Sequence, residues 1–373
     1  MQGTLTEEQA HLRKTVSALL ADRAGVPSPN APSGHDRELW ALMAGQVGLH
    51  GLGIPEVYGG AGCGSVELGV VFQEMGAVLL SAPFFASVAL AANALLASGD
   101  EEICRRFLPS VAGGDLIGSV ALTEENGRWD ETGVRLEAGR TTAGSWRLTG
   151  RKTYVVDGCA ADFLVVAARS RAGVSLFLVE TDAPGLTRTP LRGLDPTRPL
   201  ADVTFTDVPA RPVGEDGAGW PAIRRMLDLA AVCLAAEQAG GAARTLEMSV
   251  EYARTRVQFN RPIGSFQAIK HKCADMLVAV ELARSAALFA AEAAAEGRAD
   301  ASAVASLAKA TCSESFVRCA TETIQIHGGT GFTWEHPAQL YFKRARAGEV
   351  LLGSPAYHRK QLASRADLIP TGG

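Results

Sequence analysis

The hydrophobic periodicity of the chain changes twice, and this constrains the fold more than any other feature. Apolar residues recur at helical spacing up to about residue 118, in short β-rich runs from about 119 to 213, and at helical spacing again from 221 onward. Strands do not alternate with helices, and no Gly-x-Gly-x-x-Gly follows a strand, so a Rossmann sheet is disfavoured. We therefore predict an α+β chain with three domains, at residues 1–118, 119–220 and 221–373.

The first zone is predicted to be a set of helices with one interruption. Thr6 is a good helix N-cap, because its hydroxyl can accept a hydrogen bond from the first turn, where Glu7 and Glu8 follow. Gly51–Gly64 is too rich in glycine for a regular element and is predicted to be a loop. Val66–Ser98 is apolar and rich in alanine, which predicts one or two buried helices.

Short β-rich runs separated by Gly, Pro, Asp and Arg make up the second zone. The runs are Ser145–Leu148, Thr153–Val156, Phe163–Ala168, Leu176–Glu180 and Ala201–Phe205. Runs of this length and spacing are typical of antiparallel strands, so we expect a small sandwich or barrel.

Three long amphipathic segments make up the third zone. Pro221 suits the first turn of the first segment. Apolar residues recur at three- and four-residue spacing in Ile223–Leu234, Ile269–Val280 and Leu307–Ile326. Because these segments are rich in alanine, neighbouring helices can approach closely, which predicts a bundle against which further subunits pack.

Composition excludes several classes of protein. The chain is 47 % hydrophobic and 20 % charged, as is usual for a globular protein. A net charge of −4 disfavours nucleic-acid binding. No apolar run reaches about 18 residues, so we expect no membrane span. The N-terminus lacks the layout of a secretory signal, and the seven cysteines form no paired motif, so we expect reduced thiols and a cytoplasmic location.

Two polar segments are candidates for chemistry. Arg256–Gln267 places two arginines, two glutamines and two phenylalanines around a Pro-x-Gly turn, and Arg256 could hold an anionic phosphate. An ordinary helix–turn–helix with a solvated arginine explains the segment equally well. Ala121–Asp130 offers three side chains that could hydrogen-bond a ligand, although a polar hairpin loop explains them too. These side chains are Thr123, Glu124 and Asn126.

A glycine-rich helix end at Gln325–Phe332 is a third candidate. Its three glycines permit close approach of the backbone to a ligand, and the free N–H groups could meet a pyrophosphate. A plain helix stop is the alternative. His327 has no second histidine one turn away, and His336 lies nine residues on across a turn, so we predict no metal site.

Taken in order, these segments resemble the acyl-CoA dehydrogenases over essentially the whole chain. The resemblance includes IPEVYGG at 54–60, LTE at 122–124, GRKTYVVDG at 150–158, VTFTDVPA at 203–210, R-x-Q-F…I-x-x-F-Q at 256–267, and QIHGGTGF at 325–332. It implies an N-terminal helical domain, a middle antiparallel β domain and a C-terminal four-helix bundle. Members of the family bind FAD and an acyl-CoA thioester; a carboxylate removes the α proton, hydride passes to the flavin, and electrons leave to an electron-transfer flavoprotein.

The resemblance also implies that each subunit lends FAD contacts to its neighbour across a dimer interface. The matching residues are Arg256, Gln258, Phe259, Phe266, Gln267, Gln325, Ile326, His327, Gly328 and Gly329. All ten positions are retained. We therefore expect this segment pair to hold the pyrophosphate and adenosine of a neighbour's FAD.

The residues with which a family member uses its own flavin are missing. The usual base is a Glu some twenty residues after the glycine turn, where this chain has Leu352. A second known base position, on the first bundle helix, aligns with Ala230. Asp228 lies about 200° around that helix from Ala230, and Glu237 about two turns along. We therefore predict no catalytic residue in this chain.

The flavin-binding residues of the β domain are altered as well. A family Trp-x-Thr aligns with Tyr154 and Val156, so the hydroxyl that bonds the reactive end of the flavin is absent. A small Ser of the family aligns with Trp129, whose indole would fill space that the flavin ring needs.

These differences lead to one main hypothesis and two alternatives. The chain is predicted to be the non-catalytic partner in an α2β2 acyl-CoA dehydrogenase, resembling paired bacterial enzymes of which some act on steroid side-chain CoA esters. The first alternative is a self-sufficient homomeric flavoenzyme with a relocated base, Glu349 or Asp228. The second, a nucleic-acid or scaffolding role, is disfavoured by a pI near 6.0 and by the absence of a basic cluster.

Overall fold

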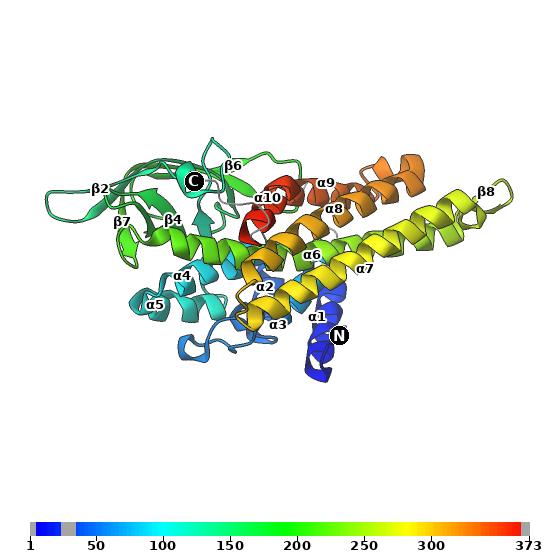
Figure 1. Cartoon of the computed structure of the whole chain (residues 1–373), viewed down its shortest axis with the longest axis horizontal. Coiled ribbons are helices and arrows are strands. Elements are labelled where there is room, and N and C mark those ends of the chain that lie inside the picture. The colour runs from blue at the N-terminus through cyan, green and yellow to red at the C-terminus, as the bar shows by residue number, and fades with distance from the viewer. Residues whose placement is uncertain (1–4, 24–34, 367–373) are drawn as a thin grey trace.

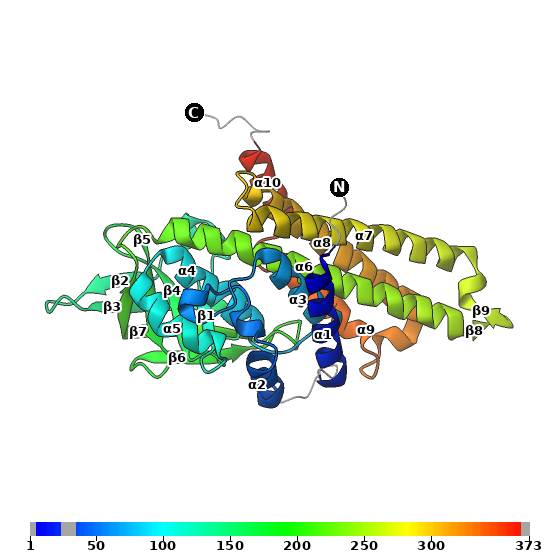
Figure 2. The same cartoon turned by 90° about the horizontal axis from the view of Figure 1, so that it is seen from below.

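A computed structural model describes residues 5–23 and 35–366, and helices, β structure and helices follow one another as predicted (Figure 1). The β domain lies at one end of the molecule, and the long helices of the bundle extend away from it. The N-terminal helices pack along one side of these long helices (Figure 2). The predicted α+β class is therefore confirmed.

The N-terminal part consists of helices joined by short loops. They are α1 (Glu7–Arg23), α2 (Arg37–Gly45), α3 (Ser65–Ala77), the π-helix η3 (Phe85–Ala92), α4 (Asn93–Ser98) and α5 (Glu101–Ala112). The predicted cap of α1 is confirmed: Thr6 Oγ1 accepts from Gln9 N at 3.2 Å, and Gln9 Oε1 accepts from Thr6 N at 3.0 Å. The predicted loop contains two short 3₁₀ turns: Leu49–Gly51 overlaps its start, and Glu56–Tyr58 lies within it.

The middle part is a small barrel. Its strands are β1 (Gly118–Ala121), β2 (Glu137–Arg140), β3 (Trp146–Val156), β4 (Phe163–Arg169), β5 (Val174–Glu180), β6 (Leu186–Leu191) and β7 (Leu200–Val213). The pairings run β4–β2–β3–β7–β5 and return from β5 to β4. Most pairs are antiparallel, as predicted. β1 pairs with β4 in parallel, and so does Glu137, the first residue of β2.

The sequence runs and the strands differ at several points. The runs at 145–148 and 153–156 belong to one strand, β3, because Gly150 continues the chain at a φ of 139° without ending the strand. β1, β2 and β6 were not predicted. β6 alternates threonine and arginine with few apolar residues and is largely exposed, so it gives a weak strand signal.

The C-terminal part is the predicted helical bundle. Its helices are α6 (Gly219–Thr255), α7 (Gln267–Ala295), α8 (Ala301–His327), α9 (Ala338–Val350) and α10 (Pro355–Arg365). α6 also packs against α3, where their backbones touch. A Cβ added at Gly76 would lie 1.9 Å from the Glu237 carbonyl oxygen, and one at Gly240 would lie 1.8 Å from that of Gln73. This crossing therefore requires glycine on both helices.

A buried charge cluster joins the three parts. Arg344 on α9 contacts Asp195 of the β domain at 2.7 Å and Glu237 of α6 at 2.9 Å. It also donates to the Leu80 carbonyl of the N-terminal part at 3.3 Å. Arg198 pairs with the other Glu237 oxygen. Burial alone would raise the pKa of Glu237, but Arg198 and Arg344 outweigh it and hold this pKa below its usual value.

Residues 5–23 and 35–366 contain neither a membrane-spanning helix nor a cluster of metal ligands. No helix there is long and apolar enough to cross a bilayer. No three His, Cys, Asp or Glu side chains in the same ranges come together as metal ligands. The cysteines are free thiols, and four of them are buried.

Candidate functional site

The predicted phosphate-binding segment forms a hairpin at the end of the bundle far from the β domain (Figures 1 and 2). β8 (Val257–Gln258) pairs with β9 (Arg261–Pro262), and a two-residue turn joins them. Phe259 and Asn260, the turn residues, have φ values of 51° and 58°, as a tight hairpin of this type requires. The segment therefore joins α6 to α7 through a short β-hairpin, and Arg256 is exposed, as the alternative of a helix–turn–helix with a solvated arginine also predicts.

The hairpin presents side chains to solvent that have few contacts within the chain. Phe259 is 86 % exposed, and its positive φ is uncommon for a bulky residue. Its ring approaches that of Phe266 edge-on at 6.1 Å, and the Arg261 guanidinium lies over Phe266 at 4.1 Å. Arg256 is exposed, and its side chain pairs with no group among the described residues. Two further predicted contacts, Gln258 and Gln267, are exposed as well.

The predicted glycine turn follows α8 directly. The 3₁₀ segment η6 (Gly328–Phe332) begins with Gly328 at a φ of 61°, and no atom lies within 4 Å of a Cβ added at Gly328 or Gly329. The backbone of this turn is thus open to a ligand. Gln325 is exposed beside it, whereas the Ile326 side chain is buried.

His327 supports this turn from inside. Its Nδ1 lies 2.8 Å from the Thr323 carbonyl oxygen, and its ring stacks on Tyr252 at 4.3 Å. Burial lowers the pKa of His327. Tyr252 belongs to the last turn of α6, just before the hairpin, so the stack links the two segments. Together we call Arg256–Gln267 and Gln325–Phe332 the tip surface.

The position of the usual base lies in a different part of the molecule. Leu352 follows α9 at a φ of 61° and is 4 % exposed. Its carbonyl oxygen lies 3.0 Å from His358 Nε2. Leu352 and Trp129 line one cavity of about 440 Å³, together with Tyr357, whose hydroxyl donates to the Trp129 carbonyl at 3.3 Å. Leu352 and Trp129, two departures from the family pattern, therefore lie on the same cavity.

The strand that aligns with the flavin-binding Trp-x-Thr has Val156 in place of the threonine, so it offers no side-chain hydroxyl at that position. Val156 is buried, and its carbonyl oxygen accepts a hydrogen bond from Ser119 Oγ at 2.6 Å. Tyr154 is 54 % exposed and has a φ of 56°. The Leu352 and Val156 side chains carry no group that accepts a proton or forms a hydrogen bond, and Trp129 is large where the family resemblance implies a small serine.

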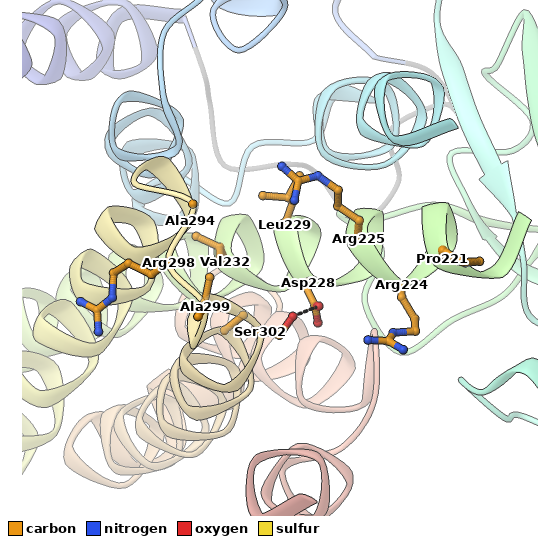
Figure 3. A pocket seen from close by; sticks show the side chains of 13 residues that line it. Pro221, Arg224, Arg225, Asp228, Leu229, Val232, Ala294, Arg298, Ala299 and Ser302 are labelled. Carbon is orange, nitrogen blue, oxygen red and sulfur yellow. Dashed lines mark hydrogen bonds between the residues drawn. The ribbon is translucent and has the colours of Figure 1, made fainter. Parts of the chain in front are cut away.

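The candidates for a relocated base are already engaged. Asp228 lines the Leu352 cavity and also a neighbouring one of about 300 Å³ between α6 and the α7–α8 turn (Figure 3). Ser302 Oγ donates to one of its oxygens at 2.5 Å, and Arg365 pairs with the other at 2.7 Å. Glu349 pairs with Arg346 at 2.7 Å. Ala230 is fully buried, and Glu237 belongs to the charge cluster.

The polar side chains of the loop at 121–130 are used within the β domain. Thr123 Oγ1 donates to the Thr153 carbonyl at 2.6 Å. Glu124 pairs with buried Lys152 at 2.7 Å, and Asn126 donates to the Gly133 carbonyl at 2.8 Å. Burial lowers the pKa of Lys152 to about 8, although Glu124 opposes the shift. These hydrogen bonds support the structural alternative for this loop.

The three-part architecture defines a class of flavoenzyme fold, and comparisons with known proteins identify the family. Family models of the acyl-CoA dehydrogenase N-terminal, middle and C-terminal domains match residues 6–115, 119–208 and 217–366. The chain therefore belongs to the acyl-CoA dehydrogenase family.

Individual relatives match along their whole length. The chain is 36 % identical to acyl-CoA dehydrogenase IpdE2 of Mycobacterium tuberculosis, over 97 % of this chain and 98 % of that protein. It is similar to the ChsE4-ChsE5 complex from the same organism, with a TM-score of 0.89, 31 % identity and complete coverage of both chains. The Tcur3481-Tcur3483 steroid ACAD gives a TM-score of 0.87 at 31 % identity, covering 98 % of this chain and 99 % of that one.

The comparisons also support FAD as the cofactor. A structure described as an FAD-dependent dehydrogenase matches with a TM-score of 0.90 and 26 % identity, over 99 % of this chain and 100 % of that one. The tip surface fits part of a dinucleotide, because it combines unpaired arginine, an exposed aromatic ring and an open glycine turn.

Two features of the molecule were missed from the sequence. Trp334, just after the glycine turn, is large and exposed, and it lies outside the motif on which the prediction was based. The charge cluster around Arg344 draws its members from segments far apart in the chain, so no local pattern indicates it. For Trp334, an aromatic residue in a polar turn was the one available signal.

Proposed function

We propose that this chain is the partner subunit of a heteromeric acyl-CoA dehydrogenase. It lacks the catalytic base and lends contacts to an FAD that a homologous catalytic subunit carries. The complex is an α2β2 heterotetramer with two FAD molecules, and it catalyses the α,β-dehydrogenation of an acyl-CoA thioester. The dehydrogenation takes place in the catalytic subunit.

The observation that carries this proposal is the buried leucine at the base position. A positioned general base typically contributes about 10²–10⁴-fold to the rate of proton transfer. Leu352 has no atom that accepts a proton, and Trp129 lies on the same cavity. The base and the space for the flavin ring are both missing at one cavity, which supports the loss of a single active site.

The tip surface supports the second half of the proposal. The side chains of Arg256 and Phe259 are exposed and do not hold this chain together, so packing within the chain does not explain why they are there. A positive φ at an exposed phenylalanine costs free energy, and such strain is common where a residue binds a ligand. Both residues can contact a ligand held by another subunit.

An apolar stripe along α7 supports a protein partner. Four large apolar side chains on this helix are between 39 % and 68 % exposed. Exposed apolar faces of this kind are typical of subunit interfaces. The four side chains are Leu277, Val278, Leu282 and Phe289. The stripe suits a second helical bundle, such as that of a homologous subunit.

Two of the similar structures are themselves complexes of two named proteins, one of them a steroid ACAD. This supports a heteromeric assembly and an acyl-CoA ester of a lipid or steroid as the substrate. An electron-transfer flavoprotein as the electron acceptor, and a cytoplasmic location, extend the proposal from the family resemblance.

FAD supplies the hydride acceptor of the reaction. The share of this chain is to bind and orient the dinucleotide through the tip surface. The Arg256 guanidinium would neutralise the pyrophosphate, the Gly329 N–H would donate a hydrogen bond to it, and Phe259 would cover an apolar part of the cofactor. The Gly328 N–H already donates to the Ile324 and Gln325 carbonyls, so Gly328 would contribute open space for the ligand and no donor. The Tyr252–His327 stack holds the two segments in register for this contact.

The proposal is tested by counting flavin. The chain is expressed alone and together with homologous subunits that carry a Glu at either base position, and flavin per chain is measured by absorbance. We expect a stable complex with one FAD for each pair of unlike chains, and no acyl-CoA turnover by this chain alone. A homomer with one tightly bound FAD per chain and acyl-CoA turnover would overturn the proposal.

One observation favours the alternative of a self-sufficient homomeric flavoenzyme: Asp228 lines the same cavity as Leu352. In that case Asp228 would act as the relocated base after release from Arg365. If a homomer proves active, Asp228→Asn and Glu349→Gln identify the base, because only the true base variant loses turnover while keeping flavin. Full turnover in both variants removes both residues as candidates for the base.

A further inference from the structure

Trp334 is an exposed indole directly behind the glycine turn. It is 68 % exposed, and Phe332 two residues earlier is 74 % exposed. Large aromatic side chains on a polar turn are costly to leave in water unless they bind something. Phe332 is the last residue of the predicted glycine-rich motif, whereas Trp334 lies just beyond it.

One face of the indole is already covered. Lys343, one and a half turns into α9, places its ammonium 4.2 Å from the centroid of the Trp334 ring. This contact fixes the indole plane, and it puts a positive charge beside the ring. Among the described residues no other ring or cation stacks on Trp334, and no carboxylate pairs with Lys343. The second face of the indole is thus free.

The position of Trp334 is tied to the rest of the tip surface. His336, two residues further on, lies 4.5 Å from His327, and His327 stacks on Tyr252 at the end of α6. Tyr252 precedes Arg256 by one helical turn. The indole, the open glycine turn and the unpaired guanidinium therefore belong to one packed unit.

A nucleotide matches this set of groups. Its phosphates meet Arg256 and Lys343, and its purine offers a flat face to the free side of an aromatic ring. A protein surface would satisfy the apolar side chains alone, without a use for two unpaired cations beside them. We infer that Trp334, held by Lys343, is a further positioning residue of the tip surface and stacks on the adenine of the FAD that the partner carries. This inference rests on the proposed function.

The test compares two flavin cofactors in the complex of this chain with its catalytic subunit. FAD has an adenine and FMN has none, so loss of a stacking contact weakens FAD alone. We expect Trp334→Ala to weaken FAD retention about tenfold, a typical effect of losing one base–aromatic stack, and to leave FMN affinity unchanged. Trp334→Phe keeps a ring and should stay within about threefold of the wild type. Quenching of Trp334 fluorescence on addition of FAD, measured against Trp334→Phe, gives a readout independent of activity.

Other results overturn the inference. An equal loss of FAD and FMN, an unchanged FAD affinity, or a weakened association of the subunits with no change in the FAD-to-FMN ratio would each exclude adenine stacking. The last result would identify Trp334 as a protein contact. Flavin per chain is measured in the same samples: one FAD per chain overturns the proposed function, whereas the FAD-to-FMN ratio still decides the role of Trp334.

Discussion

At the tip of the bundle, Arg256 and Phe259 face solvent, whereas two polar side chains near Leu352 have partners within the chain. The buried Lys309 ammonium donates to Ser313 Oγ at 2.8 Å and to the Gly348 carbonyl at 3.1 Å. His358 Nε2 lies 3.0 Å from the Leu352 carbonyl oxygen, although the buried His358 Nδ1 has no partner. The first region thus leaves its functional groups exposed, and the second uses most of them internally.

Under the proposed function, this difference is what a subunit shows when it has lost one part of a shared site and kept another. A ligand-binding region keeps unpaired donors and exposed rings, because the ligand satisfies them. A region that binds no ligand is free to fill with leucine and tryptophan side chains.

The largest effect is expected in the buried charge cluster. Arg344→Met removes the cation that joins Asp195 and Glu237 and leaves two buried carboxylates without it. Breaking a buried pair in this way typically costs about 3–5 kcal/mol, so urea unfolding should show a loss of this size. Arg105→Met, which removes an exposed pair with Glu101, is the matched control and should cost less than about 1 kcal/mol. A loss as small for Arg344→Met would mean that the cluster does not hold the three parts together.

A pH-dependent effect of similar size is expected from Lys309. Burial lowers the pKa of Lys309 to about 7, whereas in the unfolded chain it keeps its usual value near 10.5. Between pH 7 and 10.5 the unfolded chain therefore binds more protons at this residue, so its contribution to stability rises with pH by up to about 1.4 kcal/mol per unit.

Unfolding free energies at pH 7.5 and 9.5 (about two units apart) check this sign. The difference should shrink in Lys309→Met, which keeps the length of the side chain and removes its titration. An equal pH slope in the two proteins would show that the Lys309 ammonium is not destabilised by its surroundings.

At the tip surface we expect an effect on the cofactor and none on the fold. Arg256→Ala removes the charged hydrogen bond that we propose between Arg256 and the FAD. Such a bond is worth about 1.5–3 kcal/mol, so FAD retention by the complex should fall about 10- to 150-fold. Arg254→Ala, a nearby exposed arginine outside the tip surface, serves as the control. Equal FAD affinity in wild type and Arg256→Ala would contradict a cross-interface role, and a lowered unfolding free energy would indicate a structural one.

The periodicity of the sequence predicted the order of the three parts, because helices and strands of this size bury one face at a characteristic spacing. It failed where glycine changes the backbone without ending an element, as at Gly150 within β3. It also failed at the hairpin, because Phe259 rarely adopts the positive φ that the turn requires, although Asn260 is a residue type that often does.

The candidate site divides in the same way. The identities of Leu352 and Trp129 as departures from the family pattern came from the resemblance, whereas the structure shows that they line one cavity. The engagement of Asp228 by Arg365 was not predictable, since it depends on how α10 returns to α6. The exposure of Trp334 and the burial of His327 likewise depend on the packing of the bundle end, which a local pattern does not record.

The smallest effect on stability concerns the strained turn. Phe259→Gly replaces a bulky residue at a φ of 51° with one that adopts this angle at no steric cost, while it gives up a largely exposed ring. These changes nearly cancel, and the unfolding free energy should change by less than about 1 kcal/mol. FAD retention by the complex should nevertheless fall, because the ring is the part of the turn that reaches the cofactor. Asn260→Gly alters the same turn at a φ of 58° without removing a ring and should leave FAD retention unchanged. If Phe259→Gly instead destabilises the chain and spares the cofactor, the tip is a folding element, and the contrast between the two regions is lost.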